Sequence, residues 1–445
     1  MKTVEAIVEA RWVIPVEPEG VVLDHHAVVT DKGRIVAVVP QEQARQTYQA
    51  GAITSLPHHA LIPGLINAHT HTPMTLLRGL ADDLPLMRWL NEHIWPAEQR
   101  WVSPKFVSDG TTAAIAEMIK GGITCFNDMY FFPDVIAQQA AQFGIRACVG
   151  LIMLDFPTIW GEGPDDYLTK GLRVHDEFRS HPLIRTAFAP HAPYTVSDDP
   201  LKRLRTLSDE LDIPVHMHIH ETAAEVEESE QKLGKRPLAR LNGLGLVNPS
   251  LLAVHMTQLN DEEITLVADQ GVHVLHCPES NLKLASGFCP AARLDAAGVN
   301  LALGTDGSAS NNDLDMFGEM RTAALLAKGV AGDASALPAA RVLQMATLNG
   351  ARALGIADQT GSLVAGKWAD MAAVDLHGVD RLPIYHPVSQ LVYTAHRDHV
   401  TDVWIGGRHL LSQGTLTHMD ESQIQSQMVD WGLRIAASDS ELPHP

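Results

Sequence analysis

The sequence is poor in cysteine and has no apolar N-terminal leader. Its four cysteines include no C-x-x-C pair, which argues against a disulfide framework and against a thiolate zinc site. A reducing cytoplasm is therefore the expected location. Glu5, Glu9 and Arg11 interrupt the apolar residues of the N-terminal segment, so it lacks the apolar core of a signal peptide.

Long apolar runs and positive charge are also scarce. No run approaches the roughly 18 apolar residues that a membrane span needs. The chain has 33 basic and 53 acidic residues, a net charge of -20. Such a surface repels phosphate backbones and anionic lipids, so we expect neither nucleic acid nor a membrane as a partner. The simplest role of this charge is to keep the protein in solution.

Short apolar runs alternate with helical patterns through the middle of the chain. The eight strand candidates are residues 60–71, 122–130, 145–154, 184–193, 214–221, 251–257, 272–278 and 300–306. The segments after them mostly repeat apolar residues at helical spacing, and many stop at glycine. This alternation predicts an α/β fold, a (β/α)8 TIM barrel over residues 61–361, with a doubly wound sheet as the alternative.

The two ends of the chain have a different pattern. Before residue 60 and after residue 362 the apolar runs are short and are separated by turn residues such as glycine and proline. We expect residues 1–60 and 362–445 to pair into one small composite β-sandwich domain.

Histidines and carboxylates gather where the strand candidates end. In order they are His69, His71, Asp128, His191, His218 to Glu221, His255, His276 and Asp306. The carboxyl ends of barrel strands meet at one mouth, where active sites of this fold lie. One such histidine alone is more often a structural residue. Several histidines with a carboxylate suit zinc or another first-row divalent ion.

The pattern leaves the individual roles open. His216, His218 and His220 alternate onto one face of a strand, so spacing does not say which of them binds a metal. A proton donor or acceptor is also needed, and Glu221, His255 and Asp306 are the candidates. In LGTDGSASNN the simpler interpretation of Asp306 is a turn residue, which its company of histidines makes less attractive.

Several motifs together resemble the amidohydrolase superfamily, and within it the 5'-methylthioadenosine/S-adenosylhomocysteine deaminases. They are the H-x-H of NAHTHTPMTLLRG, the H-x-x-E of HIHE, the histidine of AVHMTQL, HCPESNLKL, and the aspartate of LGTDGSASNN with EMR following. The resemblance extends from about residue 4 to residue 440.

The resemblance implies a metal-dependent barrel and a composite β-domain. It also implies one metal ion, Zn²⁺ or alternatively Fe²⁺, whose ligands are His69, His71, His218 and Asp306. Superfamily members with two metals bridge them by a modified lysine at the end of the fourth strand. Here that strand ends in APHAPY, without a lysine.

The implied reaction is hydrolytic deamination of an adenine ring. A metal-activated hydroxide would attack C6 of 5'-methylthioadenosine, and also of S-adenosylhomocysteine or adenosine, giving the inosine analogue and ammonia. Glu221 would protonate N1, while Asp306 and His255 would help to take the proton of the water. The alternative is a deaminase or cyclic-amide hydrolase of another heterocycle on the same scaffold.

The resemblance also supplies substrate contacts. Trp89 and Glu98 in RWLNEHIWPAEQR match an aromatic residue near the substrate and a glutamate on the ribose hydroxyls, and His191 matches a nucleoside contact beside Glu221. Trp89 alone is read equally well as ordinary packing. A carboxylate suits a cis-diol because it accepts two hydrogen bonds. The family implies a small nucleoside substrate and a homo-oligomer, a dimer or tetramer.

The loop after the third strand departs from some relatives. It reads LIMLDFPTIWGEG and lacks the arginine that can bind a homocysteine carboxylate. Met153, Phe156, Ile159 and Trp160 would instead offer apolar surface. Burying a methylthio group there is favourable and burying an unpaired carboxylate is costly, which favours methylthioadenosine.

Two other classes fit less well. Non-catalytic assembly proteins of this superfamily usually lose metal ligands, and all four are present here. Zinc deaminases of the cytidine type use H-x-E followed by P-C-x-x-C. Residues 175–177 match H-x-E within a helical pattern, but the second motif is missing from the sequence, which excludes this class.

Overall fold

The computed structural model describes residues 1–439, which form two eight-stranded sheets. One sheet is parallel and keeps the order of the chain from β5 to β12. Its strands are β5 (Leu65–Thr70), β6 (Ile123–Tyr130), β7 (Arg146–Met153), β8 (Ile184–Pro190), β9 (Val215–Ile219), β10 (Leu251–His255), β11 (His273–His276) and β12 (Asn300–Leu303). These are the eight predicted strands, with shorter bounds.

The parallel sheet curls into a nearly closed barrel. Every residue of β6 and β7 is buried, as expected for parallel strands that are covered on both faces and read as continuous apolar runs. Just beyond β12, the backbone N–H of Asp306 donates to the carbonyl of His69 in β5 at 3.0 Å. The last and first strands are thereby joined, and the predicted barrel is confirmed.

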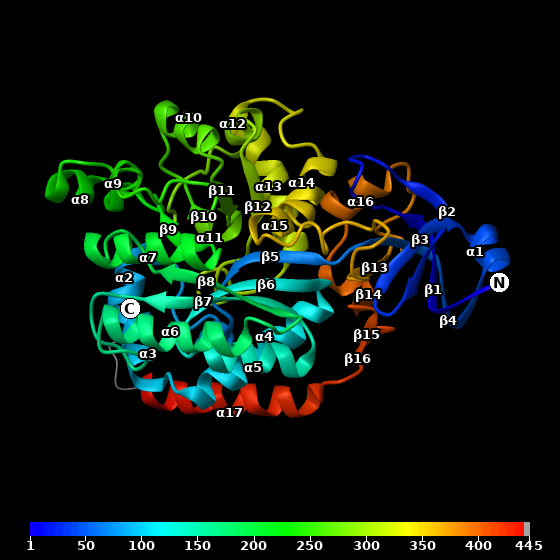
Figure 1. Ribbon diagram of the computed structural model, residues 1–445, viewed down its shortest axis with the longest axis horizontal. Coiled ribbons are helices and arrows are strands. Elements are labelled where there is room, and N and C mark those ends of the chain that lie inside the picture. Colours follow the sequence, from blue (N-terminus) through cyan, green and yellow to red (C-terminus); the bar gives the residue numbers. More distant parts are fainter. Residues whose placement is uncertain (440–445) are drawn as a thin grey trace.

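Helices surround the barrel (Figure 1). They are α4 (Pro104–Lys120), α5 (Pro133–Phe143), α6 (Pro164–Phe178), α7 (Asp198–Leu211), α8 (Ala223–Leu233), α9 (Pro237–Gly243), α10 (Asp261–Asp269), α11 (Pro278–Lys283), α12 (Ala291–Ala296), α13 (Met316–Ala331), α14 (Ala339–Met345) and α15 (Leu348–Ala353). Local signals set their ends: Asn260 and Glu263 form a capping box on α10, and α5 stops at Gly144, whose φ is 81°.

The second sheet combines both ends of the chain, in the order β16-β15-β14-β13-β4-β1-β2-β3. Its strands are β1 (Lys2–Val13), β2 (Leu23–Asp31), β3 (Arg34–Pro40), β4 (Tyr48–Pro63), β13 (Met371–Asp375), β14 (Val400–Ile405), β15 (Arg408–Ser412) and β16 (Thr415–Leu416), with α1 (Gln41–Thr47) before β4. β4 pairs with β13 antiparallel, so the blue and orange segments of Figure 1 share one β-domain, as predicted.

The first strand candidate divides between the two sheets. Residues 60–63 end β4, and β5 begins at Leu65 after Gly64. A Cβ at position 64 would lie 2.1 Å from the side chain of Thr124, so only glycine fits at this crossing. The apolar run ALIPGLI therefore serves two cores in succession.

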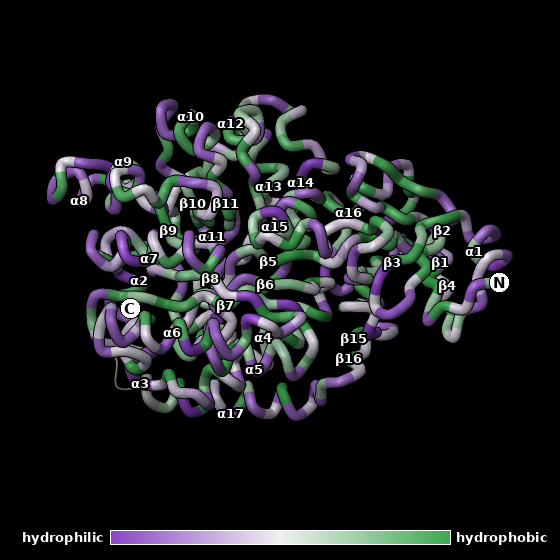
Figure 2. The backbone as a smooth tube through the Cα atoms, viewed as in Figure 1, coloured by the Kyte–Doolittle hydropathy of each residue, from purple (hydrophilic) through white to green (hydrophobic). Residues whose placement is uncertain are grey.

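The C-terminal segment adds α16 (Pro387–Tyr393), a short 3-10 turn (Arg397–His399) and α17 (Glu421–Asp439). Figure 2 shows hydrophilic and hydrophobic residues alternating along α17, which lies against α4. There the indole N–H of Trp431 donates to Asp109 at 2.8 Å. The domain division at residues 60 and 362 stays a prediction. In residues 1–439, no helix has both the length and the hydropathy of a membrane span.

An insertion follows β5 before the first long helix. It contains η1 (Thr72–Leu77), α2 (Leu86–Trp89), the π-helical turn η2 (Leu90–Ile94) and α3 (Trp95–Trp101). Trp89 ends α2 and Glu98 lies in α3. This insertion brings both residues to the mouth of the barrel, where they line the same cavity as His71 and His218.

Candidate active site

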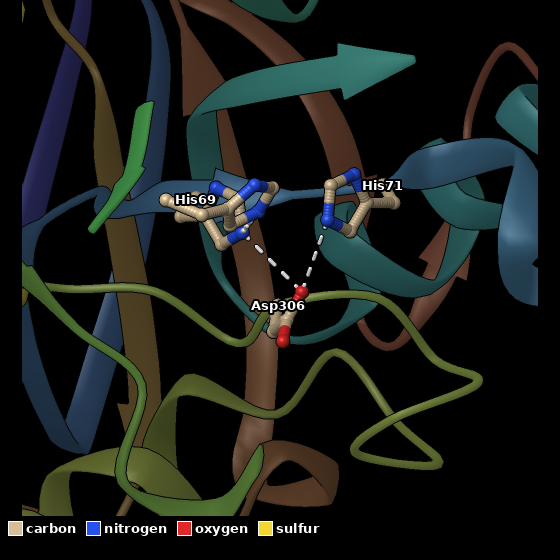
Figure 3. Close-up of side chains that lie close together, drawn as sticks. His69, His71 and Asp306 are labelled. Atoms are coloured by element: carbon tan, nitrogen blue, oxygen red, sulfur yellow. Dashed lines mark hydrogen bonds and ion pairs between the residues drawn. The ribbon is translucent and has the colours of Figure 1, made fainter. Parts of the chain in front are cut away.

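Four side chains from three strand ends converge at the mouth of the barrel. They are His69, His71, His218 and Asp306, and one ligand atom from each lies within 4.8 Å of all the others. Asp306 Oδ1 is 3.3 Å from Nε2 of His69 and 3.2 Å from Nε2 of His71. Figure 3 shows these two imidazoles pointing at the carboxylate.

Contacts behind the imidazoles orient them toward the centre. Nδ1 of His71 lies 2.5 Å from the carbonyl of Met129, and Nδ1 of His218 lies 2.8 Å from the carbonyl of His191. A carbonyl only accepts, so each Nδ1 donates and each Nε2 faces inward, where it can bind a metal ion once it carries no proton. Metal-binding histidines are commonly held in this way.

His69 is supported by another histidine. Its Nδ1 lies 2.8 Å from Nε2 of His216, which is completely buried. Burial lowers the pKa of His69 to about 4 and holds the pKa of His216 well below its usual range. Both rings are therefore neutral at physiological pH, and His69 keeps a lone pair for a metal ion.

Asp306 supplies the negative charge of the cluster. Burial opposes its ionisation, but hydrogen bonds with His69 and His71 hold its pKa well below the usual range. Burial also lowers the pKa of His71, but the carboxylate of Asp306 outweighs this effect and raises the pKa to about 9. A metal ion that binds here would displace a proton from His71.

The donor set fits zinc. Three imidazole nitrogens and one carboxylate oxygen, without a thiolate, suit Zn²⁺ and also Fe²⁺. The other carboxylate oxygen of Asp306 accepts a hydrogen bond of 2.6 Å from the hydroxyl of Ser280, which fixes its orientation.

Glu221 and His255 lie beside this cluster. The Glu221 Oε2 atom is 3.7 Å from His255 Nε2, and the hydroxyl of Ser286 donates to Glu221 Oε1 at 3.2 Å. Burial raises the pKa of Glu221, which favours a carboxyl that holds a proton. His255 Nδ1 donates to Asn281 Oδ1 at 2.9 Å, so its Nε2 can accept a proton.

A cavity of about 680 Å³ opens in front of these residues. Trp89, Glu98 and His191 all line it, together with Glu221 and His255. Among residues 1–439, its lining contains no lysine and no arginine. A neutral, partly apolar small molecule therefore suits it better than an anion.

The family model described as the amidohydrolase family matches residues 60–410. The chain belongs to the amidohydrolase family. This amidohydrolase is 48% identical over 435 residues to a "5-methylthioadenosine/S-adenosylhomocysteine deaminase" of Teredinibacter turnerae, with 98% of each chain covered. It is 49% identical over 433 residues to a protein of the same name in Saccharophagus degradans, with 97% of each covered.

Solved structures agree with this membership. A crystal structure of an adenosine deaminase from Xanthomonas campestris with bound zinc is 56% identical, with a TM-score of 0.97 and 98% of this chain and 99% of that chain covered. A crystal structure of an atrazine chlorohydrolase from Arthrobacter aurescens complexed with zinc has a TM-score of 0.90 at 23% identity, with 96% of this chain and 99% of that chain covered. The latter likeness shows the fold alone.

His276 and Asp128, two of the predicted strand-end residues of this amidohydrolase, lie outside both the cluster and the cavity. His276 is buried at the end of β11 and does not line the cavity. Asp128 accepts a hydrogen bond of 2.6 Å from the backbone N–H of Thr72, so it holds the turn that follows His71. A strand-end position alone does not separate such structural residues from candidate ligands.

The expected apolar loop is only half correct. Phe156 and Ile159 line the cavity, but Met153 and Trp160 do not. The prediction that Met153 lines the cavity is wrong, because side chains alternate along an extended chain. Its neighbours Ile152 and Leu154 face the cavity instead. Trp160 packs outside it, against Phe132, with ring centroids 5.2 Å apart.

Sequence reasoning missed the groups that support the site. The hydroxyl of Tyr130 donates to Glu98 at 2.6 Å, Ser280 binds Asp306, and Glu225 accepts hydrogen bonds from the backbone N–H groups of His220 and Glu221 at 3.0 and 2.8 Å. Glu225 stands three residues after the N-cap Thr222, and that capping spacing was the one available signal.

Proposed function

We propose that this amidohydrolase deaminates the adenine ring of 5'-methylthioadenosine by hydrolysis, releasing ammonia and the inosine analogue. S-adenosylhomocysteine and adenosine are expected as poorer substrates. One observation carries the proposal: a buried carboxyl, Glu221, lies next to a cluster of three histidines and an aspartate inside a cavity of nucleoside size. The names of the similar deaminases agree with it.

The first role is to hold the metal. His69, His71, His218 and Asp306 are the proposed ligands, because their donor atoms converge within 4.8 Å. Zinc bound in such a site lowers the pKa of a water molecule towards about 7 and so supplies a nucleophile at neutral pH.

The proton transfers fall to Glu221 and His255. The Glu221 carboxyl would give its proton to N1 of the adenine ring, which makes C6 electrophilic and gives the ring electrons a neutral destination. His255 Nε2 and the Asp306 carboxylate would receive the proton of the attacking water. A proton is then returned to the C6 amino group, which leaves as ammonia.

Glu98 would bind the ribose. Its carboxylate faces the cavity and can accept hydrogen bonds from both hydroxyls of a cis-diol. Burial raises the pKa of Glu98 to about 7, and the hydrogen bond from Tyr130 opposes that rise. Trp89 and His191 are the other proposed contacts to the nucleoside.

Substrate preference follows from the lining of the cavity. Its described residues include no lysine or arginine to pair with the carboxylate of a homocysteine tail, whereas Phe156 and Ile159 can cover a methylthio group. We also propose a homo-oligomer, dimer or tetramer, in the cytoplasm, where the four buried free cysteines would stay reduced.

The test is an ammonia-release assay on the zinc-loaded protein. The panel is methylthioadenosine, S-adenosylhomocysteine, adenosine, guanine and cytosine, and metal content is measured on the same preparation. Fastest turnover of methylthioadenosine supports the proposal. Release of ammonia only from guanine or cytosine, or from none of the panel, would contradict the proposal. It would favour the alternative, a deaminase or cyclic-amide hydrolase of another heterocycle.

A further inference from the structure

A second cavity, of about 650 Å³, lies at the opposite end of the barrel, where the strands begin. Arg146 at the start of β7, Arg185 near the start of β8 and His273 at the start of β11 line it, together with the turn after α15. It shares no lining residue with the catalytic cavity. Its chemistry is therefore independent of the proposed deaminase reaction.

The lining is cationic, although the whole chain has a net charge of -20. The basic residues are Arg146, Arg179, Arg185, Arg352, His175, His181 and His273, and the only carboxylate of the described lining is Asp212. Arg146 is neutralised by Asp370 at 2.6 Å, and Arg179 lies 3.8 Å from Asp176. The other two lining arginines, Arg185 and Arg352, are not neutralised in this way.

Arg185 and Arg352 have no carboxylate within 4.0 Å in residues 1–439. Instead, Arg185 Nη1 donates to the carbonyl of Gly355 at 3.2 Å, and Arg352 Nη1 donates to Asn349 Oδ1 at 3.0 Å. The backbone N–H of Gly355 donates to the carbonyl of Arg352 at 3.1 Å. The guanidinium of Arg185 is thus bonded to the turn that starts at the backbone of Arg352, and that of Arg352 is held by α15. Each guanidinium keeps N–H groups for another acceptor.

Strand geometry places Arg185 at the floor of the barrel. It pairs with Cys148 of β7, and it shares a face of β8 with Ala187, which belongs to the barrel interior. A further donor lies nearby: His181 Nδ1 accepts the backbone N–H of Leu183 at 3.3 Å, so the ring proton is on Nε2. Cationic and neutral N–H donors therefore line one cavity.

We propose that this cavity binds a phosphate dianion, either free or carried by a small metabolite, through Arg185 and Arg352. Guanidinium groups match the geometry of phosphate with paired hydrogen bonds. The volume lies within the range of small-molecule sites and leaves room for more than the bare ion.

The test is isothermal titration calorimetry on the zinc-loaded, full-length protein. Inorganic phosphate, ribose 5-phosphate and unphosphorylated ribose are titrated separately. Both phosphates should bind and ribose should not, and the tighter of the two identifies the source of the phosphate group. Arg185→Gln and Arg352→Gln should each weaken binding about tenfold or more, because each removes charged hydrogen bonds.

Two controls make the result specific. Arg173→Gln makes the same charge change at an exposed position of α6 that does not line the cavity, and should leave the affinity unchanged. Arg185→Lys keeps the charge but loses the planar fork, and should weaken binding less than Arg185→Gln. Thermal unfolding verifies that each variant is folded. Absence of binding to the original protein overturns the site. So does an affinity that both glutamine variants share with the original protein, since phosphate would then bind elsewhere.

Discussion

The phenol of Tyr130 donates a hydrogen bond of 2.6 Å to the carboxylate of Glu98, and both side chains line the catalytic cavity. Tyr130 ends β6, whereas Glu98 comes from the insertion after β5. The contact therefore attaches a peripheral helix to the barrel. It also decides in which direction the proposed ribose acceptor points.

Removing this contact should weaken substrate binding more than turnover. Tyr130→Phe leaves a buried Glu98 oxygen without its donor and raises the pKa of Glu98 further, because the hydrogen bond from Tyr130 lowers that pKa. We expect KM for methylthioadenosine to rise about tenfold with little change in kcat. Steady-state kinetics at about pH 7.5 measures both KM and kcat. An unchanged KM would mean that Glu98 does not bind the ribose.

Glu98 also predicts how binding depends on pH. Burial raises its pKa to about 7, above the usual value for glutamate, so the fraction of carboxylate grows as the pH rises through about 7. KM should therefore fall with rising pH and level off above that value. In Glu98→Gln, KM should be higher and should lose this dependence, as a KM series across the pH range will test.

Glu221→Gln should retain the metal and lose most of the turnover. The amide has nearly the same shape but cannot give a proton to N1, and general acid catalysis is worth about 10²- to 10⁴-fold. Ser286→Ala is the milder companion, because it removes only the 3.2 Å hydrogen bond to Glu221 Oε1 and should cost a few-fold. Turnover of Glu221→Gln within a few-fold of the original protein would assign the proton to another group.

His69→Ala and His218→Ala should each lose bound metal together with activity, because each removes one of about four ligands. Elemental analysis by mass spectrometry, beside the ammonia assay, measures both. His276→Asn is the matched control, since His276 is also a buried strand-end histidine but lies outside the cluster. Full metal occupancy in either alanine variant would contradict the proposed site.

The barrel and the histidine cluster were predictable because both follow from periodic features. Buried parallel strands read as apolar runs, and their carboxyl ends meet at one mouth. The sequence therefore predicted that His69, His218 and Asp306 lie close together. In an irregular loop the direction of a side chain follows no such period. The prediction that Trp160 lines the cavity was wrong for that reason. The contact of Tyr130 with Glu98 was equally invisible, because it depends on how the insertion after β5 folds back.

The last prediction concerns the tail of the substrate. The cavity lining in residues 1–439 has no lysine or arginine, and Phe156 and Ile159 are 44% and 59% exposed at its rim. A methylthio group covered there gains roughly 25 cal/mol per Å² of apolar surface, whereas a homocysteine carboxylate would lack a lysine or arginine partner. We expect kcat/KM to be highest for methylthioadenosine and lowest for adenosine.

Three variants test the cause of that order. Phe156→Ala should reduce the difference in kcat/KM between methylthioadenosine and adenosine. Trp160→Phe should leave that difference unchanged, because Trp160 lies outside the cavity. Ile159→Arg should raise kcat/KM for S-adenosylhomocysteine selectively, since a guanidinium can pair with the carboxylate of its tail. If the original protein already turns over S-adenosylhomocysteine as fast as methylthioadenosine, the tail either projects into water or meets an arginine of a neighbouring subunit. Gel filtration at decreasing protein concentration separates the two cases, because only the second loses this activity when the oligomer dissociates.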